Sequence, residues 1–247
     1  MLTQTSLARP SIPPLMSQPL SQRMWQPTSR PVSRAPQAPR PFAASQGLVG
    51  QMELIGTPMS FSRNTEIYGE NEPADYFYKV VSGSVRTYKI FGDGRRQIGG
   101  FYFAGDVFGL ELGEVHQFSA EAIDNCAVLL VKRSAVVALA DRNGDTARQL
   151  WSFTAGELQR VRAHMLLLIK SAEERVACFL LEMAERLSTT EAVELPMSRQ
   201  DIADYLGLTI ETVSRTLTHL EAKAMIALPT SRRVVLCNRK ALTRLDA

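Results

Sequence analysis

Residues 199–222 read RQDIADYLGLTIETVSRTLTHLEA, and this stretch decides the fold of the C-terminal part of the chain. Its first half predicts a short helix, because apolar residues recur at i, i+4 and Ser198 is a good N-cap. Gly207 is expected to end that helix, since glycine accepts the left-handed backbone that a sharp stop requires. Thr209 can cap a second helix that runs to the end of the stretch. Two short helices with a tight turn between them predict a helix-turn-helix.

The second of these helices has two faces of different chemistry. At about 100° per residue, one face is apolar and suited to packing: Val213, Leu217 and Leu220. The opposite face carries hydrogen-bonding groups: Glu211, Ser214, Arg215 and Thr218. Arginine can fork onto O6 and N7 of guanine, glutamate can accept from a base amino group, and serine can do either. Glu211, Ser214 and Arg215 are therefore candidates for reading DNA bases. The alternative is an ordinary amphipathic surface helix with a solvated polar face.

The segments around the helix-turn-helix predict a winged domain over residues 171–247. An amphipathic helix is expected over residues 171–187 and a short strand over residues 194–197. Residues 225–228 and 232–236 flank a Pro-Thr-Ser turn and predict a β-hairpin, the wing. The tip of that hairpin would present two arginines that can reach DNA phosphates, Arg232 and Arg233.

Residues 47–140 predict an antiparallel β-roll. Short apolar and aromatic runs alternate there with turn signals at regular intervals, which is typical of a barrel or roll. Gly92-Asp93-Gly94 lies between two such runs and predicts a hairpin turn. With the helices that follow, the chain is expected to be of the α+β class.

Residues 141–170 predict one long helix, since they contain no proline. Apolar side chains fall at heptad a and d positions along it: Trp151, Leu158, Val161, Met165 and Leu168. Such a seam on a helix between two domains predicts a parallel coiled-coil contact between two copies of the chain. The alternative is that the seam packs against the chain's own roll.

Composition narrows the function further. Residues 1–46 hold nine of the 13 prolines and five arginines without an acidic residue, which predicts a disordered basic arm. No apolar run approaches the roughly 18 residues of a membrane span, so no membrane partner is expected. Residues 196–247 contain eight Lys or Arg against five Asp or Glu, a mildly basic balance that phosphate contact would require.

The three cysteines are widely separated and predict neither a zinc site nor a disulfide framework, which indicates an intracellular, cytoplasmic protein. Cys178 lies three residues after Arg175 near the start of a predicted helix, where a thiolate is favoured and a redox switch is conceivable. Its alternative is a small packed apolar residue, and Cys126 and Cys237 are expected to pack. The three histidines share no ligand spacing and no catalytic set is present, so we expect no metal, no cofactor and no enzyme activity.

The order of roll, long helix and winged helix-turn-helix resembles the Crp/Fnr superfamily of bacterial transcription regulators over roughly residues 50–240. Two stretches carry the resemblance. Residues 103–111, FAGDVFGLE, are similar to the glycine-acid turn of the cyclic-nucleotide-binding roll. Residues 206–209, LGLT, precede Glu211-Thr212-Val213-Ser214-Arg215, whose E-x-x-S-R arrangement resembles the recognition helices of the FNR and FixK branch.

This resemblance implies a homodimer that binds double-stranded DNA at a TTGAT-N4-ATCAA palindrome. It implies base reading by Glu211, Ser214 and Arg215, with Arg199 and Thr209 on the DNA backbone. It also implies an activator that works with RNA polymerase in oxygen-limitation and nitrogen-fixation control.

Two departures from the superfamily affect the roll. No cysteine precedes Cys126, whereas FNR-type oxygen sensors hold an iron–sulfur centre on cysteines near the N-terminus, so that cofactor is not expected. Members that bind cyclic AMP pair an arginine with the cyclic phosphate. Here Phe118-Ser119 stands at that place, and phenylalanine cannot neutralise a phosphate, so no cyclic nucleotide is expected. The alternative function is a ligand-gated sensor that binds a small molecule or haem in the roll.

Overall fold

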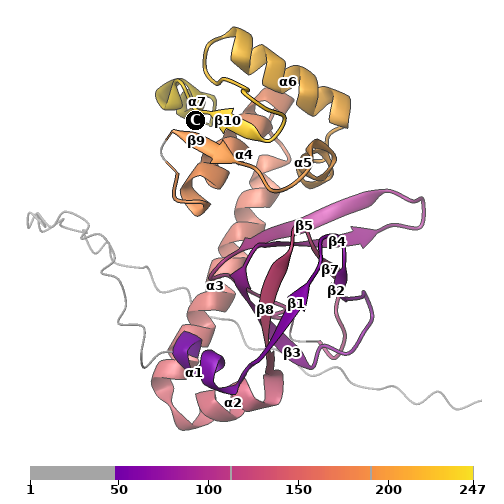
Figure 1. Ribbon diagram of the computed structural model, residues 1–247, viewed down its shortest axis with the longest axis vertical. Coiled ribbons are helices and arrows are strands. Elements are labelled where there is room, and N and C mark those ends of the chain that lie inside the picture. Colours follow the sequence, from indigo (N-terminus) through magenta and orange to yellow (C-terminus); the bar gives the residue numbers. More distant parts are fainter. Residues whose placement is uncertain (1–47, 112, 190, 247) are drawn as a thin grey trace, which may run out of the picture. The chain divides into compact units, whose positions relative to one another are not determined.

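The computed structural model describes residues 48–111, 113–189 and 191–246. A short helix, α1 (Leu48–Ile55), precedes eight strands, which are followed by two further helices and a small C-terminal domain (Figure 1). The arm expected over residues 1–46 lies outside the described residues. The structure confirms the α+β class.

Two four-stranded antiparallel sheets form the roll. The first has the order β1 (Thr57–Phe61), β8 (Cys126–Lys132), β3 (Tyr76–Ser82) and β6 (Val107–Phe108). The second has the order β2 (Glu66–Tyr68), β7 (Ser119–Ala122), β4 (Ser84–Ile90) and β5 (Arg96–Phe103). Strands distant in sequence are therefore neighbours in both sheets, as expected of a roll rather than a simple meander.

The β4–β5 hairpin turns at the predicted glycine pair. Phe91 N–H donates to the carbonyl of Arg95 at 2.8 Å, and Gly94 N–H donates back to the carbonyl of Phe91 at 2.9 Å. The predicted Gly92-Asp93-Gly94 turn is thus confirmed. From this turn β4 and β5 run back side by side, in register from Ile90 opposite Arg96.

The interior of the roll is aromatic. Tyr68, Tyr78, Tyr102 and Phe108 are all buried, and the rings of Tyr78 and Phe108 stack with their centroids 5.1 Å apart. Cys126 packs beside them, and burial raises the pKa of its thiol to about 11. Its expected role as a packing residue is confirmed.

The long helix begins later than expected. α2 (Arg133–Arg142) is separated from α3 (Gly144–Leu167) by Asn143, whose backbone is extended. The Asn143 side chain accepts a hydrogen bond from the Asp145 amide, and it therefore caps α3. A single helix from residue 141 is wrong for this reason, since the asparagine that ends one helix starts the next.

The C-terminal domain is built on α4 (Ala172–Arg186), α5 (Arg199–Leu206), α6 (Ile210–Ala222) and α7 (Arg239–Asp246). Ser171 and Glu174 form a capping box at the start of α4, which fixes where that helix begins. The apolar faces of α4, α5 and α6 share one core with Ile98, Phe101 and Phe103 of β5. The helices of the C-terminal domain are thus packed against β5 of the roll.

The wing differs from the prediction. Residues 225–228 form no strand in the described structure and contribute one isolated bridge, Ala227 to Val235. Ala227 and Val235 exchange two backbone hydrogen bonds, at 2.8 and 2.9 Å, as the predicted hairpin requires. β10 (Arg233–Val235) pairs in addition with β9 (Ala192–Glu194), which begins two residues before the strand expected over 194–197. The sequence predicts the neighbour of β10 on the hairpin but not its second partner, β9.

Gly83 offers a test of this roll, because the backbone there has a φ of +79°. A Cβ would lie 2.6 Å from the carbonyl oxygen of Asn125 and 2.7 Å from the Cα of Cys126. We expect Gly83→Ala to lower the free energy of unfolding by about 2 kcal/mol or more, measured by urea denaturation. Gly92→Ala is the control, since a Cβ there meets nothing within 4 Å and its unfolding should hardly change.

Candidate nucleic-acid interface

The first helix of the helix-turn-helix is capped at both ends. The Ser198 hydroxyl accepts from the Asp201 amide at 3.1 Å, and the Asp201 carboxylate accepts from the Ser198 amide at 3.0 Å. Gly207 has a φ of +63° and ends α5 in the left-handed conformation. The predicted turn is confirmed, and it fixes the angle at which α6 leaves α5.

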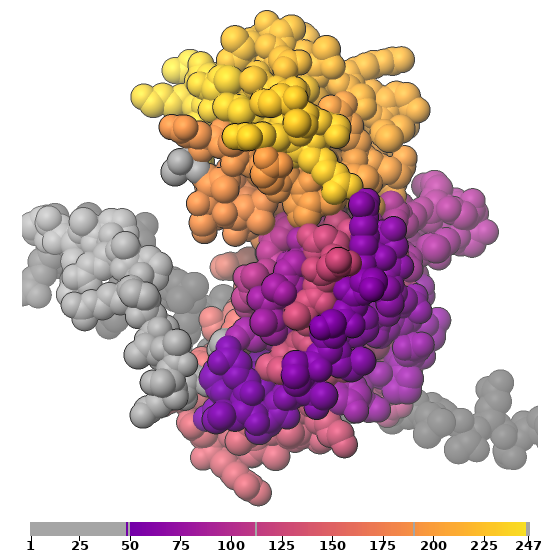
Figure 2. Space-filling view, viewed as in Figure 1, coloured from indigo at the N-terminus to yellow at the C-terminus, as the bar shows by residue number. Residues whose placement is uncertain are grey.

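The second helix shows the two faces that its sequence predicts. Thr209 caps α6 by accepting from the Thr212 amide at 3.2 Å. The inner face is fully buried: Val213, Leu217 and Leu220. The outer face has Glu211, Arg215 and Thr218 exposed and Ser214 half-buried. In Figure 2 the orange and yellow C-terminal residues form one continuous surface on the face shown.

The carboxylate at the start of α6 is held in its charged form. The pKa of Glu211 is lowered, first by a hydrogen bond from its own backbone amide and then by the Thr209 hydroxyl. Glu211 is therefore a pure hydrogen-bond acceptor at neutral pH, as contact with a base amino group requires.

The candidate phosphate contacts have different surroundings. Arg199 is half-buried in the first turn of α5, and its Nε has no hydrogen-bond partner among the described residues. In the wing the Thr230 hydroxyl accepts from the amides of Arg232 and Arg233, which orders the turn. Arg233 is exposed and lies 3.5 Å from the carboxylate of Glu194. The exposed Thr209 precedes α6 in the sequence, and the wing follows it.

Sequence reasoning missed an arginine of α4 that joins the C-terminal ends of α3 and α5. Arg175 of α4 donates from Nη2 to the carbonyl of Leu168 at 2.6 Å and from Nε to that of Lys170 at 2.9 Å. Its Nη1 donates to the carbonyl of Leu206 at 2.9 Å. One guanidinium therefore satisfies carbonyls at the C-terminal ends of both α3 and α5. No pattern in the sequence reveals these partners, because they are backbone atoms.

Two cysteine expectations change. Cys178 is half-buried on α4 and packs against the core, but it is the seventh residue of that helix. The partial charge of a helix N-terminus acts over the first turn, so Cys178 lies beyond its reach, and the redox switch stays a prediction. Cys237 follows β10 and is exposed, so its predicted packing role is wrong.

The roll contains a cavity of about 630 Å³ between its strands and α3. Its lining includes the half-buried Phe118 and the carboxylates of Glu111 and Glu157, the latter accepting from the Tyr102 hydroxyl at 3.1 Å. The two arginines of this lining are already paired with carboxylates, Arg160 with Glu157 and Arg186 with Asp106. The described lining thus holds no unpaired cation for a cyclic phosphate.

The histidines of the described ranges have protein partners and do not form a metal site. His116 is buried, stacks on Tyr68 and lies 3.0 Å from the Glu111 carboxylate through its Nδ1. His164 lies against the ring of Tyr205, and burial lowers the pKa of its imidazole. Within 48–111, 113–189 and 191–246 no three His, Cys, Asp or Glu side chains gather as metal ligands. No helix in those ranges is long and apolar enough to cross a membrane.

Known proteins share both halves of this arrangement. Residues 58–143 match the cyclic nucleotide-binding domain, and residues 174–245 match the Crp-like helix-turn-helix domain. The nitrogen fixation regulation protein FixK of Azorhizobium caulinodans is 54% identical over 199 residues, which are 78% of this chain and 80% of that protein. FixK of Rhizobium meliloti is 38% identical over 216 residues, 83% of this chain and 99% of the relative.

A solved structure agrees. FixK2 from Bradyrhizobium japonicum superposes with a TM-score of 0.76 at 53% identity, covering 78% of this chain and 98% of that one. The chain is a DNA-binding transcription regulator of the Crp/Fnr superfamily. Within that superfamily it belongs to the FixK-like branch, which confirms the resemblance of its recognition helix and its roll.

Arg175→Ala tests the joint between α3 and α5. Four charge-assisted bonds to carbonyls are lost, one of them long, and the site is partly exposed, so we expect the free energy of unfolding to fall by about 2–3 kcal/mol. Urea denaturation measures the change. Arg148→Ala, which removes an exposed arginine paired only along α3, is the control and should cost far less. Equal effects of the two variants would contradict a joint at Arg175.

Proposed function

We propose that this regulator binds as a homodimer to a TTGAT-N4-ATCAA palindrome and activates transcription in oxygen-limitation and nitrogen-fixation control. The observation that carries the proposal is the exposed polar face of α6, with Glu211 and Arg215 open to solvent above a fully buried apolar face. The names of the FixK relatives support the setting in nitrogen fixation. RNA polymerase is the partner that an activator requires, in the cytoplasm where transcription occurs.

Base reading and positioning fall to different side chains. Glu211, Ser214 and Arg215 would contact base edges in the major groove. The phosphate contacts would set the register of the protein on the duplex without reading sequence, and they come from Arg199, Thr209, Arg232 and Arg233. This division follows from exposure, because the base-reading side chains lie on the outer face of one helix.

The dimer would form along α3. One face of this helix exposes apolar side chains in the single chain: Trp151 75%, Leu158 49%, Val161 55%, Met165 62% and Leu168 36%. Other apolar side chains of α3 pack in the chain's own cores, among them Leu150, Phe153 and the buried Leu167. Val161 and Leu168 of the seam also line the cavity of the roll. A second copy would cover the exposed seam and place two recognition helices about 34 Å apart, in successive major grooves.

The second candidate function is a ligand-gated sensor, favoured by the cavity of about 630 Å³ in the roll. The paired arginines and Phe118 at its lining argue for DNA binding without a cyclic nucleotide. A visible absorption spectrum of the purified protein tests the haem form. Measuring DNA binding with and without added cyclic AMP tests the nucleotide form.

Arg215→Ala tests base reading. A bidentate arginine–guanine contact contributes about 1–3 kcal/mol of discrimination, so preference for the palindrome over a scrambled duplex should fall by about tenfold or more. Fluorescence anisotropy at one fixed salt concentration measures it, since phosphate binding varies steeply with salt. Arg233→Ala is the control and should weaken both duplexes alike. Full discrimination in Arg215→Ala would show that the recognition helix is misassigned.

The seam is tested by Leu158→Glu. A charge at a packed seam position is costly to bury, so the variant should sediment as a monomer where the unaltered protein sediments as a dimer. Gln159→Glu is the matched control, because Gln159 is exposed on a different face of α3. If Leu158→Glu dimerises with the same dissociation constant as the unaltered protein, the dimer interface lies elsewhere.

A further inference from the structure

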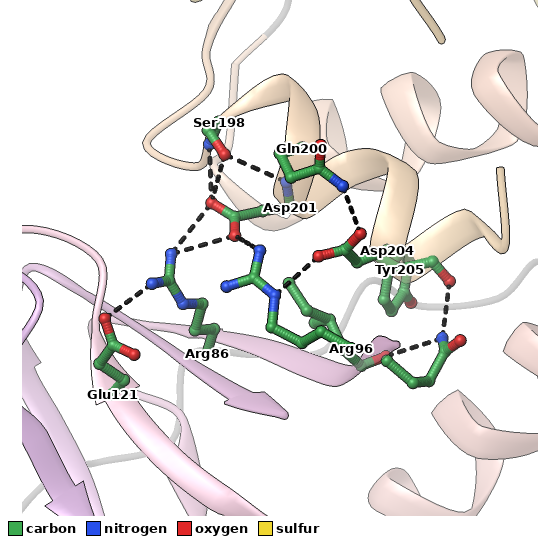
Figure 3. A network of polar contacts seen from close by, with 10 residues as sticks. Arg86, Arg96, Glu121, Ser198, Gln200, Asp201, Asp204 and Tyr205 are labelled. Atoms are coloured by element: carbon green, nitrogen blue, oxygen red, sulfur yellow. Dashed lines mark hydrogen bonds and ion pairs between the residues drawn. The ribbon is translucent and has the colours of Figure 1, made fainter. Parts of the chain in front are cut away.

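A buried carboxylate of the DNA-binding domain is held by two arginines of the roll (Figure 3). Asp201, in the first turn of α5, accepts from Arg86 Nη1 at 3.0 and 3.1 Å and from Arg96 Nη2 at 2.7 Å. Its side chain is only 3% exposed. Arg86 lies on β4 and Arg96 on β5, so the carboxylate connects α5 directly to the hairpin of the roll.

Each arginine also holds a second carboxylate. Arg86 donates from Nη2 to Glu121 of β7 at 2.7 Å, and Arg96 donates from Nε to Asp204 of α5 at 2.7 Å. We call these five residues the clasp. It contains two cations and three anions in a largely buried setting, and planar guanidiniums bridge the carboxylates in fixed directions.

Such a cluster is suited to fixing geometry rather than adding stability. Removing several charges from water costs about as much as their pairing returns, so buried ion pairs contribute little net free energy. Their directionality, however, allows one arrangement of the paired elements and disfavours its neighbours. Gln97 adds to this fixed arrangement, since its Nε2 donates to the carbonyl of Tyr205 at 3.3 Å.

The clasp and Arg175 hold the same helix at different points. The clasp holds α5 at Asp201 and Asp204, whereas Arg175 binds the carbonyl of Leu206, the last residue of α5. One attachment would leave α5 free to pivot about that point. Two attachments fix its direction, and α6 follows because it packs on α5 through a shared buried core.

We propose that the clasp sets the angle of each recognition helix relative to the roll and, in the dimer, selects the spacing between the two half-sites. Arg86 and Arg96 are then positioning residues for DNA recognition that need not touch DNA. This inference rests on the proposed binding of a homodimer to a palindrome. A DNA-binding domain that pivots on the roll could still bind one half-site, but the dimer would then accept several distances between two half-sites.

The test compares spacing preference with half-site binding. The probes are duplexes with the two half-sites separated by three, four, five or six base pairs, and a duplex with one half-site, at fixed salt. The protein is the full chain carrying Arg96→Gln, with Arg86→Gln as a second variant. Arg95→Gln is the matched control, because Arg95 lies on the same hairpin and pairs only with the exposed Asp93.

We expect the unaltered protein and Arg95→Gln to favour the four-base-pair spacer. In Arg96→Gln and Arg86→Gln that preference should fall by about tenfold, as is typical of couplings between contacting residues, while binding to the single half-site stays within about twofold. Asp204→Asn removes only the Arg96–Asp204 ion pair and leaves Asp201 with both arginines, so it should lose part of the spacing preference. Loss of stability alone would lower binding to every duplex equally.

Three results would overturn the inference. If Arg96→Gln and Arg86→Gln keep the spacing preference of the unaltered protein, the clasp does not position the DNA-binding domain. Tighter binding to every spacer, with the preference intact, would mean that the clasp restrains DNA binding instead. If the unaltered protein binds the palindrome no better than a scrambled duplex, the proposed function fails and this inference fails with it. Binding of the unaltered protein to those two duplexes is measured before any variant, so this outcome is distinguished from a failure of the clasp alone.

Discussion

The carboxylate of Asp201 is shared by two structures that the chain must build at once. It accepts from the Ser198 amide and hydroxyl, which starts α5, and it accepts from two arginines of the roll. A buried carboxylate needs such partners, because leaving it without them costs several kcal/mol. The residue that begins the DNA-binding motif is therefore also the residue that fastens this motif to the roll, and neither role can change without the other.

The helices of the DNA-binding domain behave as one packed unit. Ile202, Val213, Leu217 and Met183 all belong to a single core, which continues onto Phe101 of the roll. The ring of Phe101 lies 5.2 Å from that of Tyr205 and 6.2 Å from that of Phe179, so the contact is aromatic as well as ionic. The exposed face of α6 is consequently oriented by residues that lie far from it.

The sequence predicts what depends on neighbours along the chain. The cap at Ser198, the stop at Gly207 and the two faces of α6 follow from local rules, and the structure confirms them. The clasp could not be predicted, since Arg86 and Asp201 are 115 positions apart and meet only after the roll has folded. No signal in the sequence marked Arg86, because its strand, SVRTYKI, also carries Ser84, Thr87 and a second charged residue, Lys89. The break at Asn143 and the pairing of β10 with β9 were not predicted for another reason. Several nearby residues could cap a helix there, and several short apolar segments could pair with β10.

The open seam of α3 has a consequence for dosage in the cell. Trp151 is 75% exposed and Met165 62% exposed, so the single chain leaves a large apolar strip in contact with water. With pairing along this strip, the concentration of the binding-competent form grows with the square of the chain concentration while monomers predominate. A twofold change in synthesis or turnover would then change operator occupancy by up to about fourfold, which gives a threshold response without any ligand in the roll.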